Sequence, residues 1–280
     1  MLKRFGTGHF ILEASVMRYV NKLREKIAKG QLNFGTHCAC TDPVFYELCG
    51  GMDYDYVWID NEHGGMTSPM VTNAILATNA GGLAAMVRVV NHSVDSIKPV
   101  LEAGPDAMIF PMVNTAEQAR FLVDICKYPP MGHRGFGPQR AIGYGTMPLN
   151  EYMEQANDSI MLIMQCESKE SVDNLEEILA VPGVDAIICG PMDMSGSINK
   201  LGQLEDPEVM DLFQQMCDKC KAAGVPFGVS IGTNFKLCKY FIEQGASFCS
   251  IGTPQEYFVK MGQEIIGKIR ELEEECAQAK

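Results

Sequence analysis

The feature that most constrains the fold of this chain is an eightfold repeat of one pattern. Each repeat is a short run rich in Val, Ile, Met and Phe, followed by a polar or Gly/Pro break and then a longer segment with helical spacing of apolar residues. This is the pattern of a buried strand that leads into a helix. The eight predicted strands begin at Asn33, Tyr56, Ala84, Ala107, Ile160, Ala186, Pro226 and Phe248.

Strands that are apolar along their whole length are covered on both faces, which is typical of parallel sheets. Eight consecutive strand–helix units favour a closed (β/α)8 barrel, or TIM barrel, over an open doubly wound sheet. At 280 residues the chain has the length of one such domain. We therefore predict an α/β barrel domain over residues 21–280. An N-terminal extension over residues 1–20 is expected to add a short helix that seals the barrel bottom.

The charge and composition of the chain restrict its partners. A net charge of −12 without a basic stripe opposes nucleic-acid binding, which relies on cationic side chains that neutralise phosphates. No apolar stretch approaches the roughly 20 residues that span a bilayer, so we expect no membrane insertion. The chain has 11 cysteines, but it is long and starts without a signal-peptide pattern, which favours reduced thiols in a cytoplasm. The expected partner is a small molecule.

The segments between the strands carry their own signals. Capping-type residues open three helices, at Ser68-Pro69, at Thr115-Ala116-Glu117-Gln118 and at Ser168-Lys169-Glu170-Ser171. Residues 128–158 form a connection far longer than the roughly five residues of an ordinary loop. We expect this connection to serve an interface or a site.

Polar side chains collect where the predicted strands end, which is where barrel enzymes place their working residues. Gln165 and Glu167 are two positions apart, so they project from one face of their strand. With Asp193 after the next strand, Glu167 would suit a hard divalent ion such as Mg²⁺ or Mn²⁺. Alternatively, Glu167 and Asp193 only cap helices. The set of polar strand ends comprises Asp60, Glu62, His63, Arg88, Gln165, Glu167 and the run Gly190-Pro191-Met192-Asp193.

Five motifs in order resemble the signatures of the HpcH/HpaI aldolase family, from about residue 21 to about residue 258. Each motif alone is weak, but the ordered set is specific. They are Trp58-Ile59-Asp60-Asn61-Glu62-His63-Gly64, Val87-Arg88-Val89, Phe110-Pro111-Met112-Val113, Gln165-Cys166-Glu167-Ser168 and Gly190-Pro191-Met192-Asp193-Met194-Ser195.

The resemblance implies a metal-dependent class II aldolase that cleaves a 4-hydroxy-2-oxo acid to pyruvate, or a related 2-oxo acid, and an aldehyde. It makes Glu167 and Asp193 ligands of Mg²⁺, Mn²⁺ or Co²⁺, Arg88 the cation beside the oxo group, and His63 the acid/base residue. It also places Glu102 where the family has a carboxylate that pairs with this histidine. Substrate contacts are assigned to Gln165, Gly190, Pro191 and Met192. Arg134 and Arg140 resemble family arginines at subunit contacts, where the loop can reach a neighbour's active site, so Arg140 is also assigned as a substrate contact. The C-terminal helix is expected to pack on a neighbouring subunit, which gives dimers that assemble into hexamers.

The chemistry supports these roles independently of the resemblance. Retro-aldol cleavage leaves an enolate, whose charge a Lewis-acidic metal and a fixed arginine stabilise. Histidine is the side chain whose ordinary pKa lies nearest neutrality, and Asp60 or Glu102 could orient His63. A Schiff-base aldolase needs a lysine at a strand. None of the eight predicted strands contains one, and Lys169 just past the fifth is the nearest candidate.

Two other functions remain as alternatives. A lyase of the citrate-lyase-β or malyl-CoA type shares the barrel and the Glu/Asp pair but acts on CoA thioesters. A metal- or ligand-binding barrel without turnover is the other. His37 stands where the resembled family commonly has tryptophan, which puts the identity of the substrate in doubt. Cys217-Asp218-Lys219-Cys220 has C-x-x-C spacing, but we interpret most of the cysteines as buried thiols.

Overall fold

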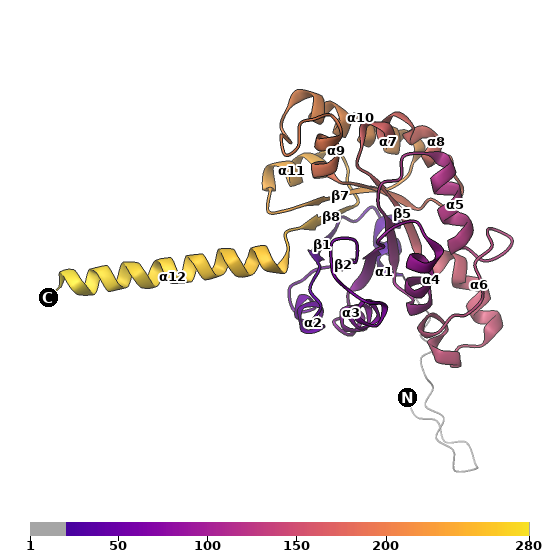
Figure 1. Ribbon diagram of the computed structural model, residues 1–280, viewed down its shortest axis with the longest axis horizontal. Helices are drawn as coiled ribbons and strands as arrows, with labels where there is room; N and C mark the ends of the chain where they lie inside the picture. Colours follow the sequence, from indigo (N-terminus) through magenta and orange to yellow (C-terminus); the bar gives the residue numbers. More distant parts are fainter. Residues whose placement is uncertain (1–20, 280) are drawn as a thin grey trace, which may run out of the picture.

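A computed structural model describes residues 21–279 as a closed barrel of eight parallel strands in the order β1 to β8 (Figure 1). This confirms the predicted (β/α)8 fold, with β5 and β7 beginning one residue later than predicted. The strands are β1 (Asn33–Cys38), β2 (Tyr56–Asp60), β3 (Ala84–Arg88), β4 (Ala107–Phe110), β5 (Met161–Cys166), β6 (Ala186–Cys189), β7 (Phe227–Ile231) and β8 (Phe248–Ile251).

Helices follow the strands and surround the barrel (Figure 1). They are α1 (Lys22–Ala28), α2 (Val44–Cys49), α3 (Ser68–Ala80), α4 (Val94–Ala103), α5 (Ala116–Cys126), α6 (Leu149–Ser159), α7 (Lys169–Asp173), α8 (Leu175–Leu179), α9 (Pro191–Ser197), α10 (Pro207–Ala223), α11 (Phe235–Glu243) and α12 (Pro254–Gln278). The predicted connection over residues 128–158 is therefore not all loop, because it contains a 3₁₀ helix η1 (Arg140–Gly145) and α6.

The strand side chains form two separate hydrophobic layers, because successive residues point to opposite faces. One layer packs outward against the helices, while the other fills the barrel interior around Tyr56, Trp58 and Phe248. Two glycines make room for these rings. A Cβ at Gly35 would lie 2.4 Å from Tyr56, and one at Gly228 would lie 2.2 Å from Phe248.

Helix α1 closes the amino end of the barrel. Its Leu23 is buried in the interior layer, and the Asn21 amide donates to the carbonyls of Asp106 and Ser159 at 2.6 and 2.9 Å. The sealing helix expected within residues 1–20 lies outside the described residues, and α1 begins just after them. Of the helices between residues 21 and 279, none has the combination of length and apolar character needed to cross a membrane.

Candidate active site

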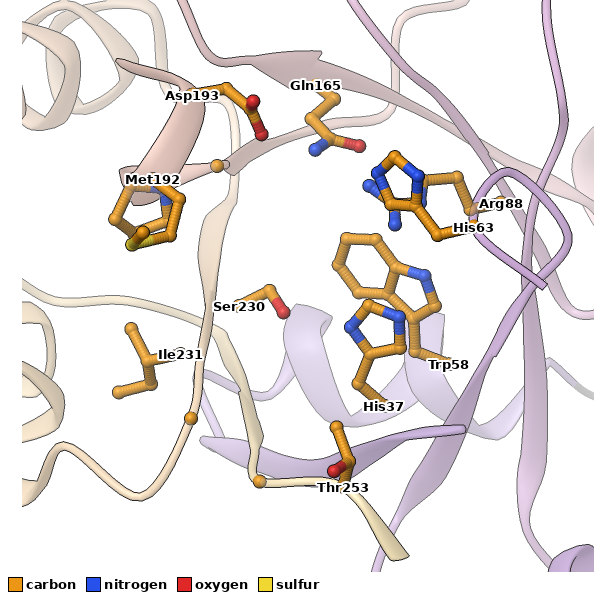
Figure 2. A pocket seen from close by; sticks show the side chains of 14 residues that line it. His37, Trp58, His63, Arg88, Gln165, Met192, Asp193, Ser230, Ile231 and Thr253 are labelled. Atoms are coloured by element: carbon orange, nitrogen blue, oxygen red, sulfur yellow. The ribbon is translucent and has the colours of Figure 1, made fainter. Parts of the chain in front are cut away.

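A cavity of about 300 Å³ opens where the carboxyl ends of the strands meet (Figure 2). This is the end of the barrel at which the sequence predicted the site. The cavity is lined by His37, Trp58, His63, Arg88, Gln165, Gly190, Pro191, Met192, Asp193, Ser230, Ile231, Gly232, Gly252 and Thr253. It therefore brings together most of the predicted polar strand ends.

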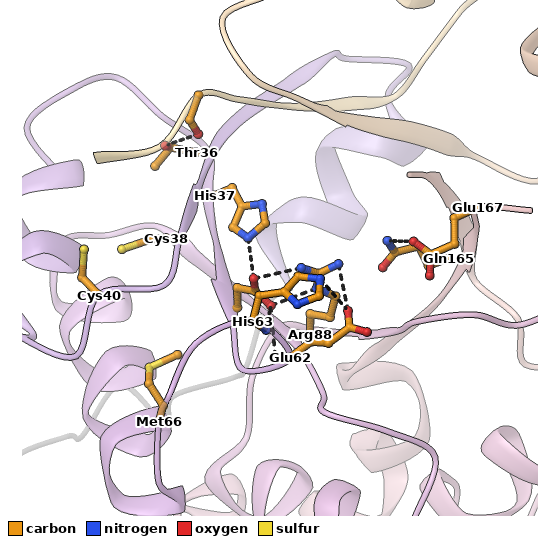
Figure 3. Close-up of polar contacts among 12 residues, drawn as sticks. Thr36, His37, Cys38, Cys40, Glu62, His63, Met66, Arg88, Gln165 and Glu167 are labelled. Carbon is orange, nitrogen blue, oxygen red and sulfur yellow. Dashed lines mark hydrogen bonds and ion pairs between the residues drawn. The ribbon is translucent and has the colours of Figure 1, made fainter. Parts of the chain in front are cut away.

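Arg88 is held in the cavity wall by two carboxylates. Its Nε and Nη2 donate to the two oxygens of Asp60 at 2.9 and 2.8 Å, and its Nη1 lies 3.0 Å from Glu62 (Figure 3). The guanidinium also lies 5.1 Å from the centre of the Trp58 ring, a cation–π contact. Arg88 and Asp60 are both buried. The arginine thus presents a fixed positive charge to the cavity.

Asp60 is ionised although it is buried. Burial alone would raise its pKa, but hydrogen bonds from His37 and Arg88 outweigh this effect and hold the pKa below the ordinary range. The backbone N–H groups of Glu62 and His63 add contacts to Oδ1 at 3.1 and 3.4 Å. This turn needs glycine at position 64, because a Cβ there would lie 2.3 Å from the Asp60 carbonyl oxygen.

The prediction that Asp60 or Glu102 orients the His63 ring is wrong within one chain. Asp60 reaches the His63 backbone, while the ring has only Glu62 nearby, with Nε2 3.8 Å from its carboxylate. Glu102 lies on α4, outside the cavity lining, 3.9 Å from Lys98. The His63 side chain is 67% exposed, so it stands at the rim of the cavity.

Glu167 is a buried carboxylate just past the end of β5. Its Oε1 accepts the Met112 N–H at 2.6 Å, and the Gln165 amide donates to Oε2 (Figure 3). Met112 adopts a φ of 50°, an uncommon backbone conformation for a non-glycine residue, at this contact. Burial raises the pKa of Glu167 to about 7, and repulsion from Asp193 contributes to the rise.

The surroundings of Glu167 fit a divalent cation. A second carboxylate, Asp193 in the first turn of α9, lines the cavity, and Glu167 is hydrogen-bonded to another lining residue, Gln165. A cation would relieve the repulsion between the two carboxylates. Gly190 leaves the space free, since a Cβ there would lie 2.6 Å from Glu167 Oε2. Gln165 also has a buried Oε1 without a hydrogen-bond partner among the described residues.

Within residues 21–279, no group of three or more His, Cys, Asp or Glu side chains is arranged to coordinate a metal ion. A cation held by Glu167 and Asp193 would therefore complete its coordination with water and substrate oxygens. Mg²⁺ is commonly bound in this way, by one or two carboxylates with several water ligands retained.

Arg140 does not reach the cavity of its own chain, so its predicted role as a substrate contact in a neighbour's site stays a prediction. It lies in η1 and donates to the carbonyls of Ala103 and Gly104 at 2.9 and 3.0 Å, and to the side chain of Asn79. These residues precede β3 and β4, at the opposite end of the barrel from the site. The charged side chain is used there to satisfy backbone carbonyls.

Sequence reasoning missed several residues of the cavity. Ser230 and Ile231 are the last residues of β7, Gly232 follows β7, and Gly252 and Thr253 follow β8. Their positions at strand ends were the available signal, but small and apolar residues carry no chemical signature. Cys217 and Cys220 are buried in α10, away from the cavity.

Comparisons with known proteins identify relatives of this chain. The chain is 35% identical over 242 residues to 4-hydroxy-2-oxovalerate aldolase of Novosphingobium aromaticivorans, covering 86% of this chain and 91% of that protein. It is 34% identical over 234 residues to 2-keto-3-deoxy-L-rhamnonate aldolase of Escherichia coli K12, covering 83% of this chain and 86% of that protein.

A solved structure of an HpcH/HpaI aldolase from Desulfitobacterium hafniense superposes with a TM-score of 0.84 at 26% identity, covering 89% of this chain and 96% of that one. The family model described as HpcH/HpaI aldolase/citrate lyase matches residues 33–260. This chain therefore belongs to the HpcH/HpaI aldolase/citrate lyase family.

Proposed function

We propose that this chain is an aldolase that cleaves a 4-hydroxy-2-oxo acid to pyruvate, or a related 2-oxo acid, and an aldehyde. The observation that carries the proposal is that Asp193 and Arg88, which Asp60 fixes, line one cavity. The buried Glu167 carboxylate lies next to this lining, because it accepts a hydrogen bond from Gln165 and is repelled by Asp193. The substrates named for the two sequence relatives are both 2-oxo acids, which supports the same class here.

Glu167 and Asp193 would hold the divalent ion, Mg²⁺ or Mn²⁺ and alternatively Co²⁺. When bound, such an ion supplies Lewis-acid stabilisation of negative charge on the 2-oxo acid half. The buried Gln165 amide, which already contacts Glu167, presents its unpartnered oxygen beside this position. Gly190, Pro191 and Met192 form the adjoining wall, against which the substrate would lie.

Arg88 would bind the oxo-acid end and stabilise the charge that develops on it. Its guanidinium cannot rotate freely, because Asp60 holds two of its nitrogens and Trp58 lies against it. A preorganised donor of this kind needs no rearrangement as charge appears, and its loss in other enzymes costs about 3 to 4 kcal/mol of barrier. His63, at the rim, is positioned to exchange protons between the cavity and solvent.

Two further properties belong to the proposal. We place the enzyme in a cytoplasm, which is supported by 11 cysteines that are all free thiols. We also propose that it is a homo-oligomer, in which α12 packs on a neighbouring subunit. Support comes from α12 itself, which leaves large apolar side chains exposed along its length.

A substrate and metal screen tests the proposed function. The purified protein, stripped of metal, is incubated with 4-hydroxy-2-oxo acids and with Mg²⁺, Mn²⁺ or Co²⁺, and pyruvate release is followed with a coupled assay. We expect release that depends on added metal and stops with chelator. Glu167→Gln should lower the rate at least about 100-fold, whereas the matched change Glu170→Gln, exposed on α7, should leave it unchanged.

Three outcomes would contradict the proposal. Undiminished turnover in chelator would remove the metal from it. Cleavage of CoA thioesters alone would favour a lyase of the citrate-lyase-β or malyl-CoA type. Metal binding that Glu167→Gln abolishes, without cleavage of any substrate, would favour a barrel that binds but does not catalyse.

A further inference from the structure

His37 is held in a single orientation on the cavity wall. Its Nε2 lies 2.8 Å from Asp60 Oδ2 (Figure 3). Its ring stacks on Trp58, with the centroids 5.0 Å apart and the planes inclined by 13° (Figure 2). The hydrogen bond fixes one edge of the imidazole and the stacking fixes its plane. Both partners are buried residues of β2, next to β1 in the barrel.

The contact with Asp60 also determines which ring nitrogen carries the proton. Asp60 is ionised, so both of its oxygens can only accept hydrogen bonds. Nε2 of His37 must therefore be the donor. In the neutral ring Nδ1 is then an unprotonated acceptor, and no group in residues 21–279 hydrogen-bonds to it. Figure 2 shows the ring on the cavity wall, with Ser230 across from it.

A carboxylate that orients an imidazole and leaves its second nitrogen free is a common arrangement for a general base. His63 lacks this arrangement, because its ring is 67% exposed and has only the Glu62 carboxylate nearby, at 3.8 Å. The His37 side chain is 23% exposed, so it is more enclosed than His63 and still open to the cavity. Of the two cavity histidines, His37 is the better oriented.

We propose that His37, oriented by Asp60, accepts the proton of the substrate's 4-hydroxyl group in the cleavage reaction. This inference rests on the proposed function. The proton passes from the hydroxyl to Nδ1 while a carbonyl forms at C4. The C3–C4 bond breaks, and its electron pair moves to the 2-oxo acid half as an enolate. That half then takes up a proton from solvent at C3, and His37 returns the proton on Nδ1 to solvent, so that an aldehyde and a 2-oxo acid leave.

Matched variants separate a base from a residue that only positions Asp60. His37→Gln retains an N–H that can donate to Asp60 but lacks a basic nitrogen, and His37→Phe retains the ring on Trp58 but lacks the donor. If His37 is the base, both variants should lower kcat for cleavage by about 100-fold, with a smaller change in KM. Free imidazole should restore part of the rate of His37→Ala. His63→Gln is the comparison, and should slow cleavage less than His37→Gln.

A second measurement distinguishes loss of the base from misfolding of the variant and from failure of the proposed function. Deuterium exchange at the methyl group of pyruvate, followed by NMR, needs no 4-hydroxyl group, so His37→Gln should retain it within a few-fold. A His37→Gln enzyme that cleaves at the wild-type rate would overturn the inference and leave the aldolase assignment intact. So would loss of both cleavage and exchange in His37→Gln. If the wild type releases no 2-oxo acid from any substrate, the proposed function fails instead.

Discussion

Asp60 shows how one residue organises the site. It accepts hydrogen bonds from Arg88, from His37 and from the backbone of the following turn, so it fixes a cation, an imidazole and a loop together. A buried charge is tolerated only where partners of this kind replace water. The sequence placed Asp60 at the end of its strand correctly. It could not show which of two histidines the carboxylate contacts.

We predict that Asp60→Asn lowers the free energy of unfolding at pH 7 by about 3 kcal/mol, because it leaves the buried Arg88 charge with Glu62 alone. The pKa of Asp60 in the folded protein lies below its ordinary value of about 3.9. Between these two pKa values the unfolded chain binds more protons, so the contribution of Asp60 is complete above about pH 5 and shrinks below about pH 4.

Urea unfolding of wild type and Asp60→Asn at a series of pH values measures this difference. Asp95→Asn, an exposed aspartate in the first turn of α4, is the control and should stay within about 0.5 kcal/mol of wild type. A difference between wild type and Asp60→Asn that already shrinks from pH 7 to pH 5 would contradict the assigned direction of the shift.

Two predicted site residues, Arg140 and Glu102, lie away from the cavity of their own chain for a shared physical reason. Strand periodicity predicts the face of the sheet from which a side chain projects. A long side chain on a loop or helix can instead extend to any nearby polar or charged group that lacks a partner. Arg140 reaches the carbonyls at the end of α4, and Glu102 lies beside Lys98 on its own helix. The family resemblance predicted a role for each residue from its place in the sequence. Which groups the two side chains contact within one chain depends on the folded structure.

At the scale of elements, the turn from β6 into α9 determines the space around Glu167. Gly190 forms this turn, and an alanine there would place its Cβ 2.6 Å from Glu167 Oε2 and 2.8 Å from Glu167 Cβ. The Glu167 side chain would have to shift from its present position. We predict that Gly190→Ala lowers Mn²⁺ affinity by about 10- to 100-fold, as changes next to metal ligands commonly do, measured by isothermal titration calorimetry.

Gly51→Ala is the matched control, because its Cβ would meet nothing closer than the Leu48 carbonyl oxygen at 3.6 Å. Thermal unfolding of both variants shows whether the fold survives the change. If Gly190→Ala binds Mn²⁺ as tightly as wild type, Glu167 does not hold the ion in the way proposed.

Most elements were predictable because the local signals agreed with one another. The starts of α5 and α7 have the capping boxes expected at Thr115 and Ser168. Helix α6 was not predicted, because it buries only Tyr152 and Ala156. An apolar face this small is hard to recognise in a mostly polar segment. The closed barrel follows from eight strand–helix units, but the length of α12 beyond it does not.

At the scale of the whole molecule, α12 is the helix whose apolar side chains are not covered within one chain. It extends away from the barrel and buries none of its residues (Figure 1). Phe258 is 80% exposed, and further apolar residues recur three or four positions apart, which places them on one side of the helix. They are Met261, Ile265, Ile269 and Leu272. An exposed apolar face of this length marks a protein interface.

We predict that wild-type protein is an oligomer and that Ile269→Lys shifts it to a smaller species, because the variant places a charge in the centre of that apolar face at a cost of several kcal/mol per copy. Sedimentation velocity at micromolar concentration gives the mass. Glu271→Lys introduces the same side chain two positions away, on the opposite side of α12, and should leave the mass unchanged. A monomeric wild type, or equal dissociation by both variants, would mean that the apolar face is not the contact. If Ile269→Lys loses cleavage activity and Glu271→Lys retains it, the active site is complete only in the oligomer.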